Sequence, residues 1–209
     1  MLAKGFAQSG QENQTEPGQV ASLTSSNNFI NFCLTVNKPL TNGQQIKSGS
    51  CNPCPMGEIP DTKHMPSSKF TSPKNFGVIK ANTNFTIDMK ILNLETGNFV
   101  NAENNYYAAP QQLEKTGKIV GHTHFVVQPV DSFTSTKPLD PNKFAFFKGV
   151  NSPADKNNVV SVSVDQGLPE GQYRLASINT AANHQPVLAS VAQHGSLDDM
   201  IYVSCLSKT

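Results

Sequence analysis

Arginine and charge are scarce in this sequence. Charged residues make up 15% of the 209, and the 16 basic residues include a single arginine, Arg174. Nucleic-acid-binding proteins need a basic surface, on which arginine makes many of the contacts to phosphates and base edges. A formal net charge of +1 provides no such surface. Nucleic acid is therefore not expected as a partner.

Long apolar runs and tryptophan are also missing. No stretch approaches the roughly 18 apolar residues of a membrane helix, so the sequence predicts no membrane span. The absence of Trp weakens a sugar-stacking platform, although residues 104–107 could present Tyr106 and Tyr107 to a ligand or simply pack them. The sequence also has no Gly-x-Ser-x-Gly, His-Glu-x-x-His or phosphate-loop motif. It thus supplies no standard catalytic signature.

The four cysteines are Cys33, Cys51, Cys54 and Cys205. An even number favours two disulfides and an oxidising compartment. We expect Cys33 and Cys205 each to pair with one member of the Cys51-Asn-Pro-Cys54 motif. A redox pair needs a helix at the motif, and prolines within and directly after it argue against one. Redox catalysis and a four-cysteine zinc site remain alternatives.

Two asparagines lie in N-glycosylation sequons, Asn13 and Asn84. Together with the cysteines, they favour a secreted, extracellular protein. No apolar segment follows Met1, so we expect any secretion signal to have been removed.

The chain changes character near residue 28. Residues 1–28 are polar, with only scattered apolar residues, and are predicted to form a flexible arm. Residues 29–209 are predicted to form one domain, with an irregular stretch over 51–73. The clearest strand pattern is in 84–94, where apolar residues alternate with polar ones. The strands predicted in this way cover residues 29–36, 84–94, 118–130, 143–150, 159–164, 172–178, 186–192 and 200–205.

Many short strands without helical periodicity indicate an all-β fold, either a sandwich or a barrel. The segment 168–173 is a turn that enters a strand with Tyr173 near its start. This arrangement is typical of a tyrosine corner in Greek-key sandwiches, although an ordinary half-buried tyrosine fits equally well. We predict a disulfide-stapled antiparallel β-sandwich of the immunoglobulin or fibronectin type.

The histidines carry the most informative chemistry. His122 and His124 are two residues apart on a predicted strand, so their side chains project from the same face. Imidazole ligands suit Cu and Zn. A third ligand is expected from His184 or His194, and Asp198 is a carboxylate that could bind the metal or orient an imidazole.

This metal site has competing interpretations. His184 and His194 flank one predicted strand and would lie about 30 Å apart if it were fully extended. Both can reach His122 only if the segment turns. Ordinary surface or hydrogen-bonding histidines are the alternative, and His64, in a predicted loop, is a weaker ligand candidate.

Several stretches of the sequence are distinctive, namely 56–60, 99–106, 121–124, 174–188 and 193–200. They resemble a family of small secreted proteins from basidiomycete fungi. The resemblance spans roughly residues 51–204 and implies an extracellular fungal origin, without implying catalytic residues.

We therefore expect a fungal cell-surface or host-interface binding protein that holds Cu or Zn through His122 and His124. Its expected partners are a cell-wall polysaccharide or a host protein. A metal-dependent redox or hydrolytic enzyme would use the same pair with an open coordination position. A structural cell-wall component without a small-molecule site is the third interpretation.

Overall fold

The computed structural model describes residues 3–12 and 17–207. The chain divides into two compact units. One comprises residues up to 42 together with 46–53, and the other comprises 43–45 together with the residues from 54 onward. A flexible arm that ends at residue 28 stays a prediction. Asn13 lies outside the described residues, whereas Asn84 is exposed just before a strand, and its glycosylation also stays a prediction.

The first unit contains two short 3₁₀ helices, η1 (Lys4–Ala7) and η2 (Phe32–Thr35). The strand predicted over 29–36 is therefore wrong. Asn28 and Phe29 both adopt a φ of 57°, a left-handed conformation that interrupts an extended chain. The ring of Phe29 instead makes edge-on contacts with Phe6 and Phe32. Local aromatic packing thus replaces sheet pairing here.

A single disulfide joins Cys33 to Cys51 within the first unit. The predicted second bridge is wrong, because Cys54 and Cys205 are free thiols. Cys205 lies in the hydrophobic core of the second unit and is fully buried. Cys54 is only half-buried. The chain therefore has one disulfide, and neither of its cysteines lies in a β-sheet.

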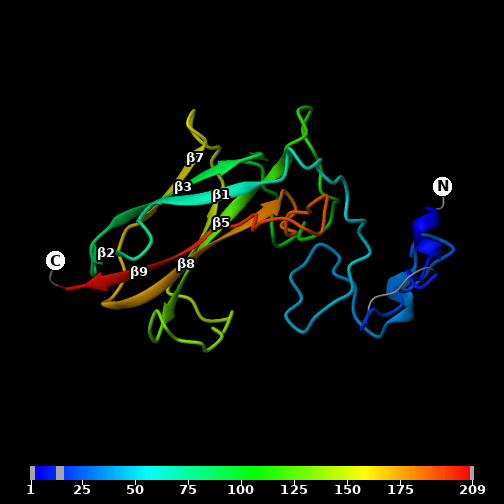
Figure 1. Ribbon diagram of the computed structural model, residues 1–209, viewed down its shortest axis with the longest axis horizontal. Helices are drawn as coiled ribbons and strands as arrows, with labels where there is room; N and C mark the ends of the chain where they lie inside the picture. The colour runs from blue at the N-terminus through cyan, green and yellow to red at the C-terminus, as the bar shows by residue number, and fades with distance from the viewer. Residues whose placement is uncertain (1–2, 13–16, 208–209) are drawn as a thin grey trace. The chain divides into compact units, whose positions relative to one another are not determined.

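The second unit is built from two β-sheets, which Figure 1 shows as two layers. The smaller sheet has the antiparallel order β1-β3-β7, and the larger has the order β2-β9-β8-β5-β4, with β6 also paired to β5. Two pairs, β2 with β9 and β4 with β5, are parallel. The bounds are β1 Ser67–Ser72, β2 Gly77–Lys80, β3 Phe85–Leu92, β4 Leu94–Glu95, β5 Ile119–Val130, β6 Phe146–Val150, β7 Val159–Val164, β8 Gly171–Ala181 and β9 Met200–Leu206.

The core lies between the two sheets and confirms the predicted antiparallel β-sandwich. Ile87, Met89 and Ile91 alternate along β3 and are buried, as the pattern in 84–94 predicts. Across the core, the rings of Phe70 in β1 and Phe125 in β5 meet edge-on, with centroids 5.3 Å apart. Burial of these apolar side chains is the main force that joins the sheets.

Three regions of the second unit depart from the predicted strands. Residues 186–192 form no strand beyond a bridge between Thr180 and Pro186. Conversely, β1 lies in the stretch predicted to be irregular, and β2 was not predicted. Both end their sheets, and β1 carries one fully buried apolar residue, Phe70. β1 is mostly polar and β2 has only four residues, so neither strand gives a clear alternation to detect. No helix in the described residues is long and apolar enough to cross a membrane.

The tyrosine corner is confirmed. The hydroxyl of Tyr173, near the start of β8, donates a hydrogen bond to the carbonyl oxygen of Pro169 at 2.9 Å. The ring itself is buried in the core. This bond connects the loop before β8 to the sheet.

We expect Tyr173→Phe to lower the free energy of unfolding by about 1 kcal/mol, because it removes this hydrogen bond and keeps the packed ring. Urea denaturation measures the change. The control is Tyr202→Phe, at a half-buried tyrosine in β9 whose hydroxyl bonds none of the described residues. Equal stability of the two variants would contradict a stabilising corner.

Candidate metal centre

The two histidines of the predicted pair lie on the outer face of the larger sheet. Side chains alternate along β5, so Phe125 and Val127 point into the core while His122 and His124 point to the opposite face. Their register partners on β8 are Thr180 and Ile178. The prediction that both imidazoles share one face is consistent with this register.

A tight turn after β8 brings the third histidine to the pair. The backbone N–H of His184 donates to the carbonyl oxygen of Ala181 at 2.9 Å, and His184 itself has a φ of 71°. The turn reverses the chain, so that His184 lies against β5. The sequence required a further turn only for both His184 and His194 to reach His122, and His184 alone does so.

The three imidazoles form one cluster. Their candidate ligand nitrogens all lie within 4.8 Å of one another. The ring centroid of His122 lies 4.8 Å from that of His124 and 4.7 Å from that of His184. His122 Nε2 and His184 Nδ1 lie 3.1 Å apart. We call His122, His124 and His184 the triad.

Backbone carbonyls orient two of these rings. His122 Nδ1 donates to the carbonyl oxygen of Asn98 at 3.1 Å, and His184 Nε2 donates to that of Val100 at 2.8 Å. With protons on those nitrogens, neutral rings turn the lone pairs of His122 Nε2 and His184 Nδ1 toward each other. Two ligands of a tetrahedral Zn²⁺ at bond lengths of about 2.0–2.1 Å lie about 3.3 Å apart, close to the observed 3.1 Å. Carbonyl acceptors on the second nitrogen are typical of metal-binding histidines.

The loop that carries these carbonyls is held to the sheet by its own backbone. The N–H of Asn98 donates to the carbonyl oxygen of Gly121 at 3.1 Å, and that of Val100 donates to Ala182 at 3.1 Å. Sequence reasoning missed both oxygens, because a backbone carbonyl leaves no residue signature. The nearest signal was the resemblance segment 99–106, which includes Val100.

Burial keeps two triad imidazoles neutral. It lowers the pKa of His122 and of His124 to about 4, and repulsion from neighbouring triad rings adds to the shift. His122 is fully buried, so charging it costs hydration free energy. At neutral pH both rings therefore keep the lone pairs that a metal ion requires.

We expect the metal-free protein to lose stability as the pH falls from about 6.5 to about 4. In this window the unfolded histidines bind protons that the folded ones reject, so protonation favours unfolding. The His122 contribution is on the order of 2 kcal/mol. Urea unfolding in the presence of a chelator, at several pH values, measures the slope. His122→Gln should flatten it and His194→Gln, at an exposed ring, should not; equal slopes in all three proteins would contradict this origin.

Each imidazole of the triad also has an aromatic neighbour. Phe99 lies 6.1 Å from His122, Phe147 lies 5.3 Å from His124, and Tyr106 lies 6.1 Å from His184, measured between ring centroids. Tyr106 stacks on Tyr107 at 4.0 Å, and burial raises the pKa of Tyr106. The tyrosine pair considered as a platform thus borders the triad.

The triad does not include the other two predicted ligands. His194 is exposed, and its Nδ1 bonds the carbonyl oxygen of Gly195. The Asp198 carboxylate accepts hydrogen bonds from Ser177 Oγ and the Asn179 N–H, both at 2.8 Å. Asp198 therefore secures the chain before β9 to β8, and its hydrogen bonds are made away from the imidazoles.

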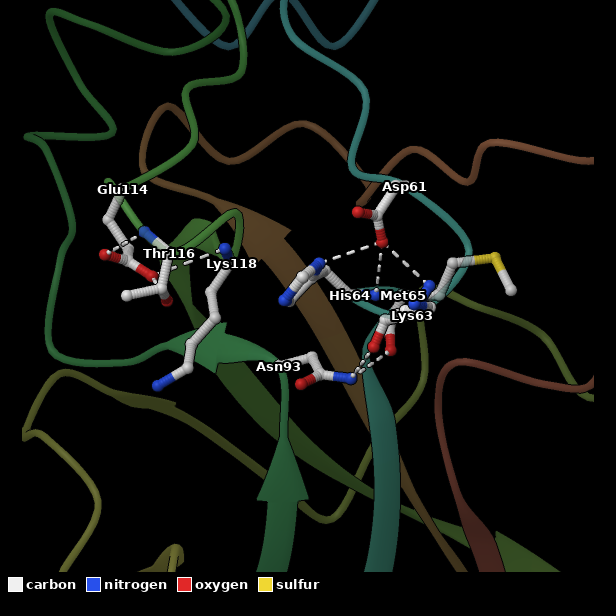
Figure 2. A network of polar contacts seen from close by, with 8 residues as sticks. All are labelled: Asp61, Lys63, His64, Met65, Asn93, Glu114, Thr116 and Lys118. Atoms are coloured by element: carbon white, nitrogen blue, oxygen red, sulfur yellow. Dashed lines mark hydrogen bonds and ion pairs between the residues drawn. The ribbon is translucent and has the colours of Figure 1, made fainter.

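His64 belongs to a separate polar network, shown in Figure 2. Its Nδ1 bonds the Asp61 carboxylate at 2.8 Å, and this contact lowers the pKa of Asp61. The side-chain amide of Asn93 donates to the carbonyl oxygens of Lys63 and Met65, both at 3.0 Å. These bonds fasten the loop before β1 to the turn after β3. The geometry gives His64 a structural contact, and among the described residues it belongs to no group of three candidate metal ligands.

Residues 68–206, from β1 to β9, match the CLU5d N-terminal domain. The chain belongs to the CLU5d N-terminal domain family. It is 42% identical over 199 residues to pathogenicity cluster 5 protein d of Colletotrichum graminicola. The alignment covers 95% of this chain and 41% of that relative, so the chain spans about two fifths of the relative's length.

The family match includes the whole sandwich and all three histidines of the triad. The resemblance to fungal proteins is thereby confirmed. Its restriction to basidiomycetes is wrong, because Colletotrichum is an ascomycete. This CLU5d N-terminal domain therefore belongs to a wider fungal family than the sequence segments suggested.

Proposed function

We propose that this CLU5d N-terminal domain is a secreted fungal host-interface protein that binds one divalent transition-metal ion through the triad. The observation that carries the metal proposal is the 3.1 Å approach of His122 Nε2 and His184 Nδ1, with the other nitrogen of each ring bonded to a carbonyl. A bound ion relieves the lone-pair repulsion and uses the orientation of both rings.

The chemistry of the ligands favours copper or zinc. Imidazole suits both ions, and for the same ligands Cu²⁺ binds more tightly than Zn²⁺. The triad leaves a coordination position for water or a ligand, because three protein ligands do not complete a tetrahedral site. That open position also supports the second candidate function, a metal-dependent extracellular enzyme.

Two observations support the host-interface part of the proposal. The relative's name links that protein to a pathogenicity cluster. The Cys33–Cys51 disulfide is of the kind that persists in oxidising compartments. A tagged copy in the producing fungus should accumulate in the culture filtrate. Retention inside the hyphae would contradict secretion.

Metal content is the direct test of the triad. Elemental analysis of protein purified from a secreting fungal host should show close to one Cu or Zn per chain. Protein stripped with a chelator should recover one ion on titration, monitored by calorimetry. A metal-free protein that also fails to bind Cu²⁺ and Zn²⁺ in titration would refute the metal site.

A further inference from the structure

We infer that the open position of the triad metal takes an aromatic ligand with ionised oxygen donors, of the catechol class. This inference rests on the proposed metal site. It joins two features of the outer face of the sheet: a group of uncharged ligands, and aromatic rings beside every imidazole.

The charge of the site favours an anionic ligand. The triad contains three imidazoles and no carboxylate among the described residues, so a bound Zn²⁺ keeps its full double positive charge. Asp198 was predicted as a carboxylate ligand, but one of its carboxylate oxygens accepts hydrogen bonds from Ser177 and Asn179. An anionic ligand neutralises this charge, and the attraction between the two is stronger in a partly buried site than in bulk water. An oxygen dianion meets this need.

The neighbouring rings favour an aromatic ligand. Phe99 and Phe147 lie beside His122 and His124, yet they remain 49% and 45% exposed. Phe147 lies opposite Val126 in the register of β6 with β5, which places it on the same outer face as the triad. Half-exposed rings at the edge of a metal site provide surfaces on which another ring can pack.

The binding step needs only proton transfer and ligand exchange. The catechol loses its phenolic protons to solvent, and its two oxygens replace water at the metal, which would expand from four to five ligands. No carbon bond forms or breaks, and no electron is transferred. Zn²⁺ is the suitable ion for the test because it has no redox chemistry.

The test uses Zn²⁺-loaded protein and 4-nitrocatechol, whose absorption spectrum changes when its oxygens ionise and bind metal. Oxalate is the matched probe, since it is a chelating dianion without a ring. We expect 4-nitrocatechol to bind the Zn²⁺-loaded protein and not to bind the metal-free protein. Zn²⁺-loaded protein that binds oxalate but not 4-nitrocatechol would overturn the inference and leave the metal site standing.

Two ring substitutions locate the ligand. Phe147→Leu and Phe99→Leu should each weaken 4-nitrocatechol binding about two- to tenfold, the size of one aromatic contact, with oxalate and Zn²⁺ affinities unchanged. The control is Phe76→Leu, at an exposed ring beside Tyr202, which should change nothing. If Phe147→Leu and Phe99→Leu both leave the 4-nitrocatechol affinity unchanged, the inference that the ligand packs on these rings is overturned. Failure of Zn²⁺ itself to bind refutes the proposed function, and the inference falls with it.

Discussion

His184→Ala is expected to lower the affinity for Zn²⁺ and Cu²⁺ by at least about a hundredfold, the upper range for loss of a supporting contact at a metal site. His184 supplies Nδ1, which lies 3.1 Å from His122 Nε2. Its loss leaves only the pair on β5. Titration against a competing chelator of known affinity measures the change.

His184 is the informative position because its ring is half-buried and its turn lies outside the sheet ladder. The matched control is His194→Ala, at an exposed histidine ten residues further along, and its affinity should equal that of the wild type. Both variants should carry Cys54→Ser, since a free half-buried thiol also binds these metals. Wild-type affinity in His184→Ala would exclude the triad as the binding site.

Phe125→Ala is expected to lower the free energy of unfolding by about 3 to 5 kcal/mol, through lost burial and the cavity that remains. The Phe125 ring is fully buried between the sheets and meets Phe70 edge-on. The surrounding side chains come from both sheets, so they cannot close the space without moving a strand.

Urea denaturation at pH 7 measures this loss. The control is Phe147→Ala, at a ring of the same size on the neighbouring strand that is 45% exposed, where the loss should be less than half as large. Equal losses at the two positions would contradict the assignment of Phe125 to the central core.

Strands whose residues alternate between buried and exposed could be predicted, and the edge strands β1 and β2, where alternation is weak, could not. The pattern in 84–94 corresponds to β3, which has a neighbour on both sides and a buried face. The prediction for 159–164 matches the bounds of β7, an edge strand that also alternates between buried and exposed residues. Residues 29–36 are as apolar as a strand, but they pack within the first unit, whose described residues form no sheet that could pair with them. Alternation reports a buried face and says nothing of whether a partner strand exists.

Part of the candidate site could likewise be predicted from the sequence, and part depended on the tertiary structure. Placement of His122 and His124 on one face follows from the two-residue period of a strand. The choice between His184 and His194 required the turn at Ala181, and the orienting carbonyls of Asn98 and Val100 required the loop after β4. Neither feature has a local pattern, because each depends on hydrogen bonds between segments far apart in the chain.

The sequence by itself determined the all-β class, the strand that carries the paired histidines, the tyrosine corner as one of two interpretations, and the exclusion of a basic nucleic-acid surface. These follow from composition and short-range periodicity. Only the tertiary structure decided which cysteines pair, which histidine joins the pair and which rings surround the triad. The physical reason is that disulfides, metal ligands and aromatic contacts depend on distances in space, which long-range burial and backbone hydrogen bonding set.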